Sequence, residues 1–174
     1  MKIVGVISSP HHDGNTATLV REALAAAASA GAEVSEVFLP GYRIEHCNGC
    51  GACLAAGSCP IPDDFEAVKA ILRQADGVIL SSPTYGGAPC ARIKALFDRL
   101  GQLAFLSSFV GGKYVAAIAT ASGFGAASTA RQLGAISGAS VLQRARLSGT
   151  LGLLLHGGHV SAMPAALERA RALG

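Results

Sequence analysis

Tryptophan is absent from this 174-residue chain, and aromatic residues make up only 5% of it. Charged residues are also scarce, at 14%, and their formal sum is only +3 at neutral pH. A charge this small and this mixed argues against the dense basic surface that is typical of nucleic-acid binding. No apolar run has the length of a membrane span, and no signal peptide is visible after Met1. We therefore expect a cytoplasmic protein that binds neither nucleic acid nor a membrane.

Apolar residues, by contrast, make up 51% of the chain, which is enough for a full core in one domain over residues 1–174. Short β-branched runs alternate with amphipathic segments, without a linker or an internal repeat. The predicted strands are 3–7, 33–39, 78–80, 114–119 and 141–147, and the predicted helices are 15–30, 65–72, 93–106, about 126–136 and 165–173. This alternation predicts an α/β fold, with a doubly wound five-stranded parallel sheet and helices on both faces.

The first strand leads into a polar loop over residues 8–14, and a helix follows from Asn15. Free backbone N–H groups and the positive end of the dipole make such a helix N-terminus favourable for an anion. Gly14 permits close approach, and neighbouring Ser and Thr side chains add hydrogen-bond donors. An ordinary strand-to-helix turn, with Asn15 as the N-cap, would have the same local sequence.

Two further loops, 81–89 and 120–125, follow the third and fourth predicted strands, so all three loops share one edge of the sheet. Tyr85 offers a flat ring beside Gly86 and Gly87, which suits an aromatic heterocycle. A G-x-G-x-x-G dinucleotide fingerprint is absent. An aromatic mononucleotide with one phosphate fits this edge better than a dinucleotide does.

Two stretches carry a family resemblance: Ser8-Ser9-Pro10 with Gly14-Asn15-Thr16, and Ser82-Pro83-Thr84-Tyr85 with the segment 93–99. They resemble the flavodoxin-like, NADPH-dependent FMN reductases, although that family usually has Arg or Lys where His11 and His12 stand. The resemblance implies a sheet of order 2-1-3-4-5, FMN as cofactor and NAD(P)H as electron donor. The FMN-binding residues that this reading proposes are Ser9, His11, Asn15, Thr16, Ala17, Pro83, Thr84, Tyr85, Gly86, Gly87, Thr120, Ser122 and Gly123.

The connection over residues 40–62 contains a C-x2-C-x2-C-x5-C-P run formed by Cys47, Cys50, Cys53 and Cys59. Its spacing differs only in the last gap from the ferredoxin pattern that holds a [4Fe–4S] cluster. Structural zinc, which favours two separated C-x2-C pairs, is a poorer match. The run resembles the compact cysteine motif of iron–sulfur flavoproteins. The alternative is that the thiols hold no cluster and pack the loop against the flavin or form a dimer contact.

The functional hypothesis is an FMN-dependent NAD(P)H oxidoreductase that passes electrons to a quinone, a free flavin or another small acceptor. One alternative is an iron–sulfur flavoprotein that transfers electrons between a [4Fe–4S] cluster and FMN. A second is a non-catalytic flavodoxin-type electron carrier or ligand-binding module. No residue is proposed as a catalytic acid or base, because the flavin supplies the chemistry.

The apolar helix 93–106, continued by Phe109 and Val110, predicts a homodimer or homotetramer. Asp98 and Arg99 read as charges on a helix surface, and Cys90 reads as a small buried residue. Asp63 and Glu66 have the spacing of a reciprocal helix cap. Residues 156–159 read as a flexible loop before the last helix.

Overall fold

The computed structural model describes residues 1–104, 113–138 and 146–174 of the chain. Its strands are β1 (Lys2–Ile7), β2 (Glu33–Phe38), β3 (Gly77–Tyr85), β4 (Ala88–Pro89), β5 (Tyr114–Ala121) and β6 (Arg146–Leu154). Its α-helices are α1 (Asn15–Ser29), α2 (Ala52–Ala56), α3 (Phe65–Gln74), α4 (Ala91–Ala104), α5 (Ala126–Gly138) and α6 (Pro164–Arg171). Two 3₁₀ turns, η1 (Leu39–Gly41) and η2 (Val160–Ala162), complete the list. Within these residues, no helix is both long and apolar enough to cross a membrane.

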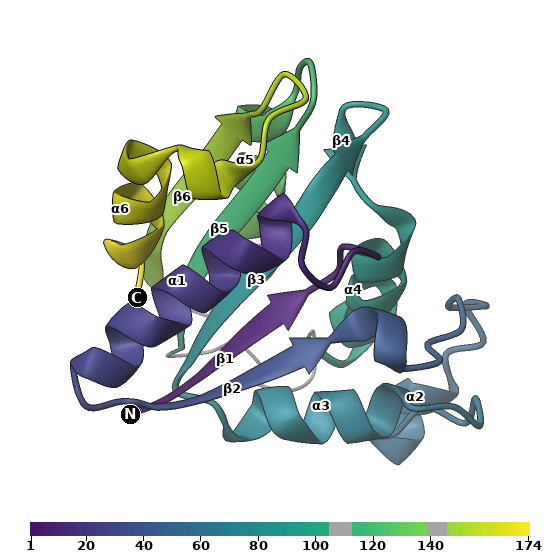
Figure 1. Cartoon of the computed structure of the whole chain (residues 1–174). Coiled ribbons are helices and arrows are strands. Elements are labelled where there is room, and N and C mark those ends of the chain that lie inside the picture. The colour runs from purple at the N-terminus through teal and green to yellow at the C-terminus, as the bar shows by residue number, and fades with distance from the viewer. Residues whose placement is uncertain (105–112, 139–145) are drawn as a thin grey trace.

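The sheet confirms the predicted flavodoxin-like architecture (Figure 1). Its five long strands are all parallel and run in the order β2-β1-β3-β5-β6, with the short β4 paired antiparallel to β3. Counted without β4, this is the expected order 2-1-3-4-5. Ile7 pairs with Ser81, and Ser81 pairs with Ile118, so β1, β3 and β5 lead into their loops at the same edge.

Two apolar layers cover the sheet (Figure 1). Helices α1 and α6 pack on one face, and α3, α4 and α5 pack on the other. The strands alternate accordingly, because Val4 and Val6 enter one layer while Ile7 enters the other. Gly5 lets α1 approach β1, since a Cβ at this position would lie 2.6 Å from the Val20 side chain.

Two strands differ from the sequence prediction. The stretch 81–85 was expected in a loop, but it continues β3 and turns back at Gly86 and Gly87 into β4. Most of the predicted strand 141–147 lies outside the described residues. The described strand β6 extends to Leu154, well beyond the predicted end. Leu151 and Leu153, two positions apart, are both buried, as expected for alternate residues of a strand. Glycines interrupt the apolar pattern of this strand in the sequence.

The predicted reciprocal cap of Asp63 and Glu66 is wrong, because the N-cap of α3 is Asp64, whose side chain makes no capping hydrogen bond. Asp63 accepts a hydrogen bond from the Phe65 backbone N–H at 3.1 Å. Glu66, however, accepts from the Cys59 backbone N–H at 2.8 Å and does not reach back to Asp63. The start of α3 is thereby tied to the cysteine-containing connection.

Candidate functional site

The loop 8–14 brings an open helix N-terminus to the edge of the sheet. Gly14 is the N-cap of α1, and no side chain caps that end of the helix. The first N–H groups of an α-helix have no acceptor within the helix. Inside the loop, the His11 N–H donates to Ser9 Oγ at 3.2 Å, and the Gly14 N–H donates to the His11 carbonyl at 3.2 Å. The result is a folded loop with unused donors at its end, the arrangement that binds phosphate.

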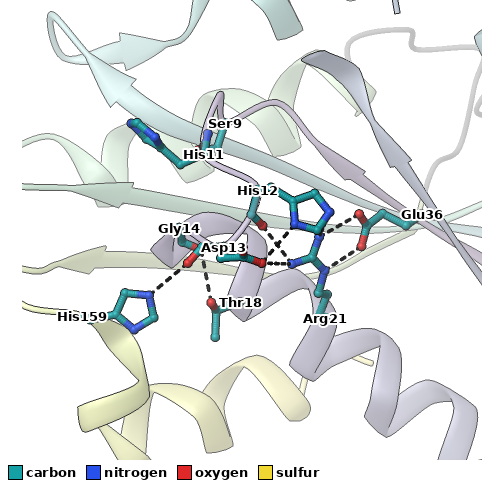
Figure 2. A network of polar contacts seen from close by, with 9 residues as sticks. All are labelled: Ser9, His11, His12, Asp13, Gly14, Thr18, Arg21, Glu36 and His159. Atoms are coloured by element: carbon teal, nitrogen blue, oxygen red, sulfur yellow. Dashed lines mark hydrogen bonds and ion pairs between the residues drawn. The ribbon is translucent and has the colours of Figure 1, made fainter. Parts of the chain in front are cut away.

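Arg21, on α1, binds this loop through hydrogen bonds (Figure 2). Its guanidinium donates to the His12 carbonyl at 2.8 Å and pairs with both carboxylate oxygens of Glu36 at 2.8 and 2.9 Å. The hydrogen bond to Glu36 is the main cause of a raised pKa at Arg21, so its charge is fixed. Because Glu36 lies on β2, the pair ties the loop to the neighbouring strand. Arg21 thus positions the loop.

The segment 156–160 packs against the same loop. The Asn15 side chain donates to the Gly158 carbonyl at 3.2 Å and accepts from the Val160 N–H at 2.6 Å. His159 contacts the Asp13 carbonyl through Nε2 at 3.2 Å (Figure 2). The sequence interpretation missed His159, because a Gly-rich stretch gave no sign that it returns to the first loop. Asn15 is therefore neither the N-cap nor a free donor, and it holds the segment that carries His159.

A cavity of about 320 Å³ lies between the three loops. Of the predicted FMN-binding residues, the following line it: Ser9, His11, Asn15, Thr16, Pro83, Thr84, Tyr85, Thr120 and Ser122. Gly14, Ala121, Leu155 and His159 line it in addition. Ala17, Gly86, Gly87 and Gly123 do not. Ala17 is fully buried in α1, while Gly86 and Gly87 form the β3–β4 turn.

The cavity is lined by hydroxyl-bearing side chains and by the ring of Tyr85. The hydroxyl groups of Thr16 and Thr120 lie 2.7 Å apart and join the start of α1 to the end of β5. Thr84 Oγ1 is buried and has no hydrogen-bond partner within the described parts of the chain. Tyr85, which lines the cavity, is 56% exposed, so its ring is accessible to a ligand. A planar, polar ligand with an anionic tail would satisfy these features together.

The unpaired hydroxyl of Thr84 gives a direct test. Among the described residues, Thr129 Oγ1 in α5 is likewise buried without a partner, but Thr129 does not line the cavity. Replacing either threonine by valine keeps the shape and removes an unsatisfied hydroxyl, so neither change should lower the free energy of unfolding of the ligand-free protein. We expect Thr84→Val alone to weaken FMN binding by about tenfold, the equivalent of one hydrogen bond of ~1.4 kcal/mol. Fluorescence titration with FMN measures this, and equal affinities in the two variants would contradict it.

A second cavity of about 400 Å³ shares Tyr85 with the first. Its other walls come from Tyr42, Ile44 and His46, from Cys90, and from the start of α4, which includes Arg92. Cys90 is 4% exposed and its sulfur lies 3.2 Å from Ser8 Oγ, which confirms the prediction of a small buried residue. Tyr85 thus separates the first cavity from a second one that lies toward the cysteine-containing connection.

Cys47, Cys50, Cys53 and Cys59 surround one small cavity of about 20 Å³. Two glycines with positive φ, Gly51 and Gly57, cap the short helix α2 and allow the chain to fold tightly around it. Over residues 1–104, 113–138 and 146–174, no three His, Cys, Asp or Glu side chains are placed to hold a metal ion. The four thiols are therefore gathered in one place, but they do not form a ready set of ligands.

Arg99 lies at this cavity and is 2% exposed, so its interpretation as a surface charge was wrong. Its guanidinium pairs with the fully buried carboxylate of Asp63 and lies 4.1 Å from the centre of the Phe65 ring. Burial alone would raise the pKa of Asp63, but hydrogen bonds from Arg99 and two backbone N–H groups leave it lowered. Asp98 is paired with Lys94 on the exposed side of α4, as expected.

Residues 1–150 match the model of a family described as NADPH-dependent FMN reductase. An iron–sulfur flavoprotein of Methanocaldococcus jannaschii is 43% identical over 99 residues, which cover 57% of this chain and 51% of the relative. A solved flavone reductase superposes with a TM-score of 0.78 at 18% identity, over 99% of this chain and 60% of that one. A flavodoxin from the domain Archaea gives a TM-score of 0.63 at 15% identity, over 99% of this chain and 93% of that one. The likeness to the solved structures shows the fold alone.

The matches to curated relatives are partial. This chain spans about half the length of the curated relatives that it matches. The family model, in contrast, covers most of the chain and includes the three loops around the first cavity.

Proposed function

Because the chain belongs to the NADPH-dependent FMN reductase family, we propose that it binds FMN in the first cavity and passes electrons from NAD(P)H to a small acceptor. The observation that carries this proposal is that one cavity joins the uncapped N-terminus of α1 to Thr84, whose hydroxyl has no hydrogen-bond partner in the described part of the chain. These two features suit the phosphate and the polar edge of a flavin, respectively.

Each loop would contact a different part of FMN. The loop 8–14 and the start of α1, including Thr16, would hold the phosphate through backbone N–H groups and side-chain donors. Thr84 and Tyr85 would lie along the ring system, with Thr120 and Ser122 on its other side. Bound flavin supplies the transfer of a hydride and of electrons, so the protein has to orient the ring and admit two substrates in turn.

We further propose that the acceptor enters the second cavity, since Tyr85 forms a wall of both. A flat molecule such as a quinone could lie there against the aromatic rings of Tyr42 and Tyr85. Arg92 offers a positive charge in the same wall. The chain is proposed to act as a homodimer or homotetramer. Phe109 and Val110, on which that prediction partly depends, lie outside the described residues, so sedimentation of the purified protein is the test.

The proposal is tested on the full chain purified without oxygen. We expect one FMN per chain in the absorption spectrum. We also expect oxidation of NADH or NADPH in the presence of a quinone or free flavin. FMN without any turnover of NAD(P)H would favour the electron-carrier alternative. Protein that neither carries nor takes up FMN would overturn the proposal.

A second candidate function is that of an iron–sulfur flavoprotein with a [4Fe–4S] cluster beside FMN. Four thiols around one cavity supply the donor type and number that such a cluster needs. The name of the relative from Methanocaldococcus jannaschii, at 43% identity, supports this reading. Cys47, Cys50, Cys53 and Cys59 would bind the cluster, which when bound would store and pass on one electron at a time.

A further inference from the structure

A buried cation with unused donors lies beside the four cysteines. Arg99 Nη1 donates to the Asp63 carboxylate and, at 3.3 Å, to the Glu45 carbonyl. Arg99 Nε and Nη2 are buried and have no hydrogen-bond partner within the described part of the chain. Native structures seldom leave such groups without a partner, least of all on a charged side chain. Apart from the Cys59 sulfur, with which the guanidinium interacts, the described part of the chain supplies no acceptor to these two nitrogens.

The surroundings of these two nitrogens indicate what kind of acceptor would suit them. Arg99 and the four cysteines line the same small cavity. Burial would lower the pKa of Arg99, but its contacts with Asp63 and with the Cys59 sulfur raise it, so the guanidinium is charged. Its position is fixed by Asp63 on one side and by the Phe65 ring on the other. A rigid cation that faces sulfur atoms favours an acceptor made of anionic sulfur.

We propose that Arg99 is a positioning residue for the [4Fe–4S] cluster, with Nε and Nη2 donating hydrogen bonds to its sulfur atoms. This inference rests on the second candidate function above. Reduction adds one negative charge to the cluster, and donors aimed at its sulfur atoms stabilise that charge. Arg99 therefore raises the reduction potential of the cluster. Because the guanidinium is buried, added salt screens this effect only weakly.

The test uses the full chain prepared without oxygen and compares Arg99→Gln with Lys94→Gln. Both changes remove one positive charge from α4, but Lys94 is exposed and pairs with Asp98. Iron, sulfide and FMN are measured, and the cluster potential is followed by electron paramagnetic resonance during titration with dithionite. We expect Arg99→Gln to shift the reduction equilibrium about tenfold toward the oxidised form, which is ~59 mV for one electron. Lys94→Gln should leave the potential unchanged. Arg99→Lys keeps the positive charge, so its potential should lie between those of Arg99→Gln and the wild type.

Arg99→Gln leaves Asp63 buried without its partner, and this could prevent folding. In that case the double variant Asp63→Asn with Arg99→Gln is compared with Asp63→Asn alone, and the same shift is expected. A potential equal to that of the Lys94→Gln variant would overturn the inference while the cluster itself stands. Wild-type protein with full FMN and no iron would overturn the cluster and this inference together, and it would leave the FMN proposal intact.

Discussion

Replacing Asn15 and Thr16 together by leucine is expected to abolish the binding of FMN. Thr16 is 2% exposed and its hydroxyl lies 2.7 Å from that of Thr120, so leucine would break this link and intrude on the cavity. Leucine at position 15 would release the segment that carries His159. The double variant loses two interactions that support a charged ligand, each worth roughly 1.5–3 kcal/mol. The affinity for FMN should therefore fall at least about 100-fold. Equilibrium dialysis of the ligand-free variant against FMN measures this loss.

The control for this experiment is Ser29→Leu, which places leucine at an exposed position near the other end of α1. It should bind FMN as the wild type does, and thermal unfolding of both proteins shows whether the helix remains folded. Thr16→Val, which removes only the hydroxyl, should give a smaller loss of affinity than the double variant. A double variant that retains yellow, stoichiometric FMN would show that the phosphate site lies elsewhere.

The alternation of strands and helices could be predicted because its signals are local, whereas the order of the strands in the sheet followed from the family resemblance. The β-branched apolar run 3–7 is typical of a buried parallel strand. The polar loop after it ends at Gly14, where a helix begins. Thr120 lies near the end of β5, at the same edge of the sheet. Nine of the residues predicted to bind FMN line one cavity for this reason, although their contact with FMN itself stays a prediction.

What could not be predicted depends on partners that are distant in the sequence. Arg99 lies among charged residues of an amphipathic helix, and only the fold brings it to Asp63, 36 positions earlier. Asn15 and Val160 are 145 positions apart, so the return of His159 to the first loop leaves no local trace. In β6, Gly152 lies beyond the predicted strand 141–147. A Cβ there would lie 2.4 Å from the backbone of Ala127, so only glycine lets α5 pack so closely on this strand.

The four cysteines of the connection 40–62 are expected to bind iron and sulfide. If Cys47, Cys50, Cys53 and Cys59 hold a [4Fe–4S] cluster, protein prepared without oxygen should contain about four iron and four sulfide per chain. Replacing any one of the four by alanine should reduce both contents to a small fraction of that value. Ligation supplies much of the energy that orders such a loop, so these variants should also make the segment 40–62 more susceptible to proteolysis. All of them should keep FMN, because the first cavity does not include these residues.

Cys90→Ser is the matched control for these variants. Cys90 is buried near Ser8, away from the cavity that the other four cysteines line, and serine preserves its contact with the Ser8 hydroxyl. This variant should keep its full iron and sulfide content. The same loss of iron in Cys90→Ser and in the four loop variants would indicate general destabilisation. Negligible iron in wild-type protein that carries FMN and oxidises NAD(P)H would mean that the four thiols only pack the loop, and the chain would then act as a flavin reductase without a cluster.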